Sequence, residues 1–185
     1  MLGEFDKQGI HGRGKIHMIL IRPLTEADLE QHLKLCSTLD QESEFMLLEP
    51  GERTTSLEQH RLINQPLLDA EHSTILVAEG EGRLVGHLVA RGSELARIRH
   101  SAYLVIGILR EYSNRGLGSQ MFGALEHWRQ ANSITRLELT VMAHNEAALA
   151  LYTKQGFDIE GIKRNSIRIR GQYMDEYYMA RIVGE

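Results

Sequence analysis

The sequence is poor in several features, and each shortage excludes a class of protein. Cys36 is the only cysteine among 185 residues, so no intrachain disulfide can form and a reducing compartment is expected. No apolar run approaches ~18 residues, so no transmembrane helix is predicted. Asp and Glu (25) outnumber Lys and Arg (21), giving a net charge of −4. We therefore expect neither a nucleic-acid partner nor a membrane partner.

What remains is the composition of an ordinary soluble domain, with 42% hydrophobic and 25% charged residues. The length suits a single domain with a sizeable core. Residues 1–17 differ from the rest, because they contain four glycines and no apolar period. They also lack the apolar centre of a signal peptide. We expect residues 1–17 to form a flexible N-terminal extension and residues 18–185 to form one cytoplasmic domain.

Hydrophobic periodicity predicts alternating strands and helices of a mixed α+β domain. Thr25 with Asp28, and Thr55 with Glu58, have capping-box spacing, and Pro66 is expected to end the second helix. The predicted strands are 18–22, 74–79, 84–91, 97–109, 136–142, 157–170 and 173–182. One predicted helix begins after Thr25, and three others span 55–66, 116–131 and 145–155. The single strand–helix–strand crossover should be right-handed.

The stretch Y-S-N-R-G-L-G-S, residues 112–119, follows an apolar strand and opens the predicted helix 116–131. The first N–H groups of a helix have no intrahelical partner and carry partial positive charge, so they attract phosphate. Glycines allow a phosphate to approach the backbone, and Asn114 tolerates a positive φ. Arg115 adds a cation and Ser119 a hydroxyl. The stretch therefore predicts a phosphate-binding loop.

Two common phosphate motifs do not fit this loop. A Walker A string, G-x-x-x-x-G-K-[ST], is absent from the sequence. A dinucleotide fingerprint would need a third glycine where Met121 stands, and it would come early in its domain. A nucleotide-dependent oxidoreductase is therefore disfavoured, and a coenzyme A pyrophosphate loop is the remaining candidate.

Here the sequence resembles the GCN5-related N-acetyltransferase (GNAT) family over roughly residues 19–183. Residues 113–118 match its loop pattern [QR]-x-x-G-x-[GA], except that Ser113 stands where Gln or Arg is usual. The segment H-N-E-A-A-L-A-L-Y-T-K-Q-G-F, residues 144–157, is similar to the family's N-x-x-A-x-x-L-Y-x-x-x-G-F segment. The tail at 171–179 is similar to the closing strand of several acetyltransferase branches. The resemblance implies a mostly antiparallel, twisted sheet of six to seven strands, with parallel, splayed fourth and fifth strands and about four flanking helices.

The resemblance also implies acetyl-CoA as cosubstrate and a set of residues that bind it. Backbone groups of Ile106 and Ile108 should contact the pantetheine arm, and Gly107 is expected to mark a β-bulge that leaves an N–H for the thioester oxygen. Asn145 should cap the following helix and contact the cofactor. The pyrophosphate would lie on the loop residues Ser113, Asn114, Arg115, Gly116, Leu117, Gly118 and Ser119.

The implied reaction is direct attack of a primary amine on the thioester within a ternary complex. Tyr152 is the candidate catalytic residue, because a tyrosine with a pKa near 10 stays protonated at pH 7 and can protonate the departing thiolate. The general base stays open among bulk water and four side chains that could act through water. These are Glu79, His100, Glu111 and Glu138.

The acceptor is expected to be a small amine, an amino acid, a polyamine or a protein N-terminus. Glu42, Glu44 and Glu49 lie in the region expected to form its wall, although a solvated acidic loop is the plainer interpretation. The nine histidines show no metal-ligand spacing, so no metal is predicted. A homodimer is also expected. The alternative function is a non-catalytic acyl-CoA sensor or scaffold of the same fold, and the presence of Tyr152 favours the enzyme.

Overall fold

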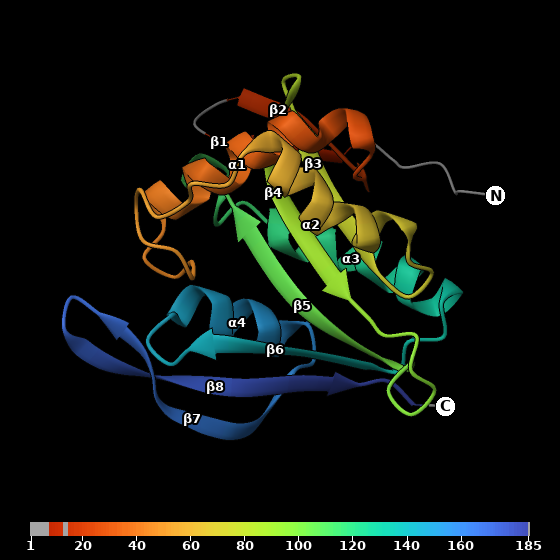
Figure 1. Cartoon of the computed structure of the whole chain (residues 1–185), viewed down its shortest axis with the longest axis vertical. Helices are drawn as coiled ribbons and strands as arrows, with labels where there is room; N and C mark the ends of the chain where they lie inside the picture. The colour runs from red at the N-terminus through yellow and green to blue at the C-terminus, as the bar shows by residue number, and fades with distance from the viewer. Residues whose placement is uncertain (1–7, 13–14, 185) are drawn as a thin grey trace.

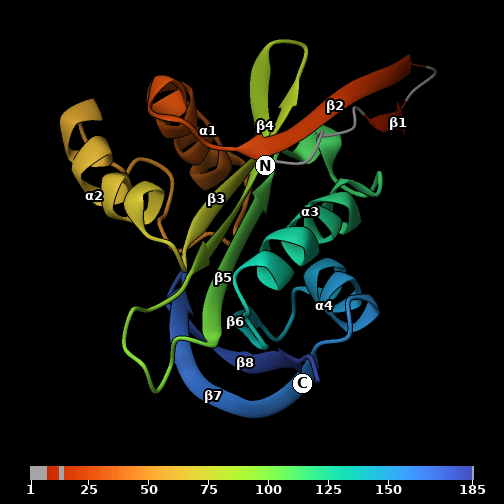
Figure 2. The ribbon, with the colours of Figure 1, turned by 90° about the vertical axis from the view of Figure 1, so that its right-hand side faces the viewer.

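The computed structural model describes residues 8–12 and 15–184, which form one sheet with helices on both faces (Figures 1 and 2). The eight strands have the order β1-β2-β3-β4-β5-β6-β8-β7. They span β1 Gln8–Gly12, β2 Lys15–Pro23, β3 Thr74–Gly80, β4 Arg83–Arg91, β5 Ser101–Ile108, β6 Arg136–Met142, β7 Asp158–Ile169 and β8 Gln172–Ile182. The helices are η1 Glu26–Asp28, α1 Leu29–Glu42, α2 Leu57–Asp69, η2 Arg110–Tyr112, α3 Leu117–Ala131 and α4 Glu146–Lys154.

The predicted fold class is confirmed, with one additional strand. All strand pairs are antiparallel except β5 with β6, which run parallel. Strand β1 and the first residues of β2 lie within 1–17, the segment assigned to an N-terminal extension. Residues 8–12 pair with residues 15–19, so this part of the segment extends the sheet. Residues 1–7 and 13–14 lie outside the described residues, and the flexibility of the extension stays a prediction.

The first two helices begin at capping boxes, as predicted, but the box of the second lies one residue later than expected. Asp28 accepts hydrogen bonds from the backbone and hydroxyl of Thr25 and also from Arg22, which fixes the entry to α1. At α2 the capping box consists of Ser56 and Gln59, one residue after the expected pair. The helix also continues through Pro66 to Asp69. A proline has no N–H, so Pro66 leaves the carbonyl of Leu62 without its helical hydrogen bond. Leu62 is 69% exposed, so this part of the helix faces solvent.

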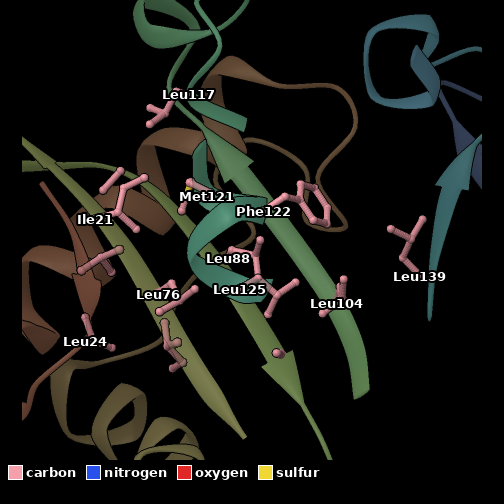
Figure 3. Packing of buried hydrophobic residues seen from close by; sticks show 14 of the residues in the cluster. Ile21, Leu24, Leu76, Leu88, Leu104, Leu117, Met121, Phe122, Leu125 and Leu139 are labelled. Atoms are coloured by element: carbon pink, nitrogen blue, oxygen red, sulfur yellow. The ribbon is translucent and has the colours of Figure 1, made fainter. Parts of the chain in front are cut away.

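The core lies between the sheet and α3 and between the sheet and α1. In Figure 3, Met121, Phe122 and Leu125 of α3 project onto Leu88 of β4 and Leu104 of β5. Figure 2 shows α3 and α4 on one face of the sheet, with α1 and α2 on the other. No helix within residues 8–12 and 15–184 is both long and apolar enough to cross a membrane.

Candidate active site

The parallel strands β5 and β6 separate after a short paired start. Their register covers only Ser101–Arg136, Ala102–Leu137 and Tyr103–Glu138, although β5 continues to Ile108 and β6 to Met142. Beyond Tyr103, the edge of β5 that faces β6 therefore has no strand partner. The strand begins at Ser101 rather than at residue 97, because residues 97–100 form a turn. The expected splay of two parallel strands is present at this position.

The backbone of β5 points alternate residues toward the open edge. The N–H of Leu109 donates to the carbonyl of Val85, which makes 85–109 a hydrogen-bonded antiparallel pair. Because such pairs alternate along a ladder, Gly107 and Val105 also direct their backbone groups toward β4. Ile106 and Ile108 then direct theirs toward the opening between β5 and β6. This orientation suits an extended amide chain that lies along β5 as an added strand.

Gly107 does not mark a bulge, which corrects the expectation from the sequence. The register between β4 and β5 runs without a shift from Gly86–Ile108 to Arg91–Tyr103. A Cβ at residue 107 would lie 2.7 Å from Leu39 Cδ1 and 3.1 Å from His87 Nε2. A glycine is needed here because α1 and a β4 side chain pack closely against the strand. The separation of β5 from β6 thus occurs without a bulge at this residue.

The loop before α3 has the backbone of an anion nest. Asn114 has a φ of 57° and Gly116 a φ of 83°, so both are left-handed. Gly116 is the N-cap of α3, and the first intrahelical bond from this end runs from Gln120 N–H to the Gly116 carbonyl. The N–H groups of residues 117–119 are thus left without helical partners at the amino end of a 15-residue helix. A Cβ at Gly116 would meet nothing within 4 Å, so this glycine serves the backbone conformation.

The second glycine of the loop and the unusual serine have different roles. A Cβ at Gly118 would lie 2.7 Å from Leu151 Cδ2, so Gly118 lets α3 and α4 pack together. The Ser113 hydroxyl donates to the carbonyls of Leu109 at 3.2 Å and Ile108 at 3.4 Å. Ser113 therefore ties the loop to the end of β5, a local role that a longer Gln or Arg side chain would not fill in the same way.

Tyr152 lies on α4 and is 7% exposed. Its ring packs against Phe122 at 6.1 Å and Phe157 at 5.9 Å between centroids. Burial raises the pKa of Tyr152 above its ordinary value of 10, and the neighbouring Tyr103 raises it further. Tyr103 is the last residue of β5 that pairs with β6, so the phenol of Tyr152 lies near the point where the strands separate. Tyr152 is protonated at neutral pH, as a proton donor must be.

Asn145 caps α4, because its side chain accepts a hydrogen bond from Ala148 N–H at 3.1 Å. This confirms the capping role expected from the sequence. The cap fixes the first turn of the helix that carries Tyr152, so both residues belong to one rigid element beside the opening between β5 and β6.

A cavity of about 740 Å³ opens at the carboxyl end of β5. Its walls are the segment 41–50 after α1, the ends of β5 and β6, and the tip of the β7–β8 hairpin at 167–170, which approach one another in Figure 1. The lining carries both signs of charge, with Glu42, Glu44 and Glu49 on one wall and Arg110, Arg168 and Arg170 elsewhere. Glu42 is hydrogen-bonded to Arg110, because the backbone N–H of Arg110 donates to the Glu42 carboxylate at 2.9 Å.

None of the four proposed general bases is among the described residues that line this cavity. Glu79 accepts from Arg22, and Glu138 accepts from Arg136, each at 2.9–3.0 Å. Glu111 pairs with Arg83. His100 precedes β5 and so lies at the opposite end of this strand from the cavity. The three carboxylates are therefore ion-paired side chains.

The three arginines of the cavity were missed by the sequence analysis. Arg110 lies in η2, whereas Arg168 is the second-to-last residue of β7 and Arg170 lies in the turn after this strand. Arg168 also lies over the ring of Tyr173, 5.6 Å from its centroid. No sequence signal brings these segments together, because 57 residues separate Arg110 from Arg168 and only the folded hairpin brings the two parts close.

Comparison with known proteins agrees with this geometry. Residues 35–157 match the family model "Acetyltransferase (GNAT) family". The chain belongs to this family. It is 34% identical over 128 residues to the L-amino acid N-acetyltransferase AaaT of Escherichia coli (strain K12), covering 67% of this chain and 74% of that protein. It is 27% identical over 168 residues to the spermidine N(1)-acetyltransferase of the same strain, covering 88% and 85%.

A solved structure supports the assignment. The crystal structure of a GNAT-family acetyltransferase from Streptococcus pneumoniae superimposes with a TM-score of 0.84 at 29% identity, covering 90% of this chain and 99% of that one. This GNAT protein is therefore an acetyl-CoA-dependent N-acetyltransferase that acts on an amine.

Proposed function

We propose that the enzyme binds acetyl-CoA in the opening between β5 and β6 and transfers the acetyl group to an amine that enters from the 740 Å³ cavity. The observation that carries this proposal is the unpaired edge of β5, which leads from the separation at Tyr103 toward the glycine loop. Backbone groups of Ile106 and Ile108 would bind the pantetheine amides. The N–H groups of Leu117, Gly118 and Ser119, with Arg115, would bind the pyrophosphate.

The same geometry supports a direct reaction in a ternary complex. The amine attacks the thioester carbonyl from the side of the cavity, and an N–H of β5 stabilises the charge on the carbonyl oxygen. Tyr152 gives its phenolic proton to the departing sulfur and regains one from solvent. Since the Glu and His candidates do not line the cavity, the amine proton leaves through water. Asn145 contacts the cofactor at the start of α4.

We further propose that the acceptor is a free amino acid or another α-amine that carries a carboxylate. Arg168 and Arg170 are cations on one wall of the cavity, and a carboxylate is their natural partner. A polyamine has no carboxylate to pair with these arginines, whereas an amino acid offers a carboxylate to them and an amine to the glutamates of segment 41–50. The 34% identity to an L-amino acid N-acetyltransferase points the same way.

A panel of acceptors tests this assignment with thiol release as the readout. We expect L-amino acids to be acetylated with a kcat/KM at least tenfold above that of the matching amino acid amides, because the amide lacks the carboxylate. Arg168→Gln and Arg170→Gln should narrow that ratio, whereas Arg164→Gln, in the same hairpin but outside the cavity lining, should leave it unchanged. A preference for spermidine over every amino acid would contradict the acceptor class but not the acetyl transfer.

Two further expectations belong to the same proposal. A cytoplasmic location is supported by Cys36, which is free and buried. A homodimer is supported by exposed apolar side chains on β7 and β8, which are Ile159, Ile162, Tyr173 and Tyr178. Light scattering would test the oligomeric state. A scaffold that only binds acyl-CoA would be indicated if acetyl-CoA raised the melting temperature but no amine released thiol.

A further inference from the structure

Four ligand-type side chains meet on the α1–α2 face of the sheet, outside the cavity and the acetyl-transfer chemistry. His32 and Cys36 come from α1, His60 from α2 and His87 from β4. His32 Nε2 lies 2.8 Å from His87 Nδ1, and His32 Nδ1 lies 3.0 Å from His60 Nε2. The Cys36 sulfur lies 3.8 Å from His32 Nε2 and 3.9 Å from His87 Nδ1. All four residues are at most 7% exposed, so this is a fully buried cluster.

The three facing atoms have the size of a metal site. His32 Nε2, His87 Nδ1 and Cys36 Sγ lie within 4.8 Å of one another. A tetrahedral centre with bonds of about 2.0 Å to nitrogen and 2.3 Å to sulfur would hold such atoms roughly 3.3–3.6 Å apart. The nitrogen–nitrogen distance would open by about 0.5 Å and the two sulfur distances would shorten by about 0.3 Å. Both changes are well under ~1 Å.

The candidate ligands are too far apart in the sequence for a metal-binding motif to reveal them. His32 and Cys36 are four residues apart on α1, which puts them on the same helix face. His87 comes from β4, 51 residues after Cys36. His60 contacts the far nitrogen of His32 and so sets the orientation of its ring, as outer partners of metal-binding histidines commonly do.

The protonation state of the two histidines also allows them to bind a metal. Burial lowers the pKa of His32 to about 2 and that of His87 to about 4, so both rings are neutral and can offer lone pairs. Burial raises the pKa of the Cys36 thiol to about 11. A cation can replace the thiol proton, which leaves to solvent as the metal–sulfur bond forms. Thiolate and imidazole are ligands that select Zn²⁺ and Cu⁺, two ions with filled d shells.

We propose that His32, Cys36 and His87 bind one Zn²⁺ or Cu⁺ ion, with His60 orienting His32. The ion joins α1 to β4 directly behind Gly107, since His87 Nε2 faces that residue of β5. It thereby fixes α1, the helix that leads into the acceptor wall, relative to β4, which pairs with the strand β5 beside the cofactor opening. This differs from the expectation of no metal, which considered only ligands close together in sequence.

The test begins with full-length protein treated with a chelator under reducing, oxygen-free conditions. One sample is titrated with ZnCl₂ and another with Cu⁺ stabilised as a weak complex, and bound metal is counted after desalting. We expect one ion per chain and a rise in melting temperature of about 5–10 °C at 100-fold excess over Kd. The ion that binds more tightly is the one that we assign to the site. No stoichiometric binding of either ion below ~10 µM would overturn the proposal.

Variants separate this site from surface binding. Cys36→Ala removes a ligand and should weaken binding at least 100-fold, and it should abolish the metal-dependent thermal shift. His60→Gln should weaken binding about tenfold without changing the stoichiometry. His72→Gln replaces a buried histidine outside the cluster and should bind as wild type does. Wild-type affinity in Cys36→Ala would show that the ion lies elsewhere, and the metal titration of the wild type stands even if a variant does not fold.

Discussion

The cofactor side of the molecule and the side formed by the acceptor cavity and the histidine cluster carry their chemistry in different ways. The groups assigned to the cofactor come from three short continuous segments, 106–108 of β5, 113–119 and 145–152, and act largely through the backbone. The acceptor cavity at the carboxyl end of β5 and the histidine cluster buried on the α1–α2 face instead combine side chains from segments far apart in the chain. Recognition of a fixed cofactor is thus encoded locally, whereas the acceptor and metal sites depend on the completed fold.

The strongest test of the cofactor side is Gly116→Val. The residue has a φ of 83°, which a β-branched side chain does not adopt without strain, and the loop N–H groups would be displaced. We expect acetyl-CoA affinity to fall at least about 100-fold. Isothermal titration measures this directly. Gly123→Val, at a position of α3 where a Cβ meets nothing, is the matched control and should bind normally. Full affinity in Gly116→Val would move the phosphate site elsewhere.

Tyr152→Phe tests the chemistry on the same side. The change removes the hydroxyl but keeps the ring contacts with Phe122 and Phe157. We expect kcat to fall about 100-fold with little change in KM for acetyl-CoA, because the proton donor acts only as the thiolate leaves. The melting temperature serves as the control and should stay close to that of the wild type. An unchanged kcat in an assay limited by chemistry would exclude this role.

Much of the cofactor side could be predicted from the sequence, because its signals are local. Positive φ at Asn114 and Gly116 follows from residue type, and the helix pattern after them is periodic. The reasons for the remaining glycines could not be predicted. Gly107 and Gly118 are required by Leu39 and Leu151, which reach them only after the helices pack. A glycine in a sequence shows that space is needed but not which neighbour needs it.

Gly107→Ala tests the junction between the two sides. Its methyl group would meet Leu39 Cδ1 at 2.7 Å and the His87 ring at 3.1 Å. We expect a loss of about 1–3 kcal/mol in the free energy of unfolding, since the neighbours must shift to make room. Urea denaturation measures it, and Gly123→Ala should instead stabilise α3 by about 0.5–1 kcal/mol. No destabilisation would mean that α1 is packed more loosely against β5 than the distances indicate.

The smallest expected effect concerns an ion pair that links α3 to β8. Hydrogen bonds from Arg129 lower the pKa of Glu126 from 4.5 to about 2, with Gln130 and Arg181 contributing. A lowered pKa means stability that is present above pH 4.5 and is lost as pH falls toward 2. At pH 7, Glu126→Gln should cost about 1 kcal/mol of unfolding free energy, and the difference from wild type should shrink below pH 4.5.

Urea midpoints at pH 7, 5 and 3 measure this dependence. Glu30→Gln is the control, because Glu30 belongs to a solvent-exposed pair with Lys34 and its loss should leave the midpoint unchanged. A constant difference between Glu126→Gln and wild type across the pH range would show that the carboxylate charge contributes nothing.

The acceptor side was the least predictable region. The segment between α1 and α2 has no hydrophobic period, and its residue types fix no shape. The hairpin tip with Arg168 and Arg170 reaches the cavity only because β7 and β8 are long and extend past the end of β6 (Figure 1). The histidine cluster has the same origin, since no pair of its members except His32 and Cys36 has a regular spacing. Three-dimensional placement was needed for both.

The open edge of β5 also has a consequence for handling the protein. A strand with unpaired N–H and C=O groups is a template on which another chain can add a strand and begin to aggregate. In this enzyme that edge lies within the sheet, and the pantetheine proposed to cover it has amides of its own. We therefore expect coenzyme A to suppress aggregation during expression and storage, so the cosubstrate would act as a solubilising agent for the protein that consumes it.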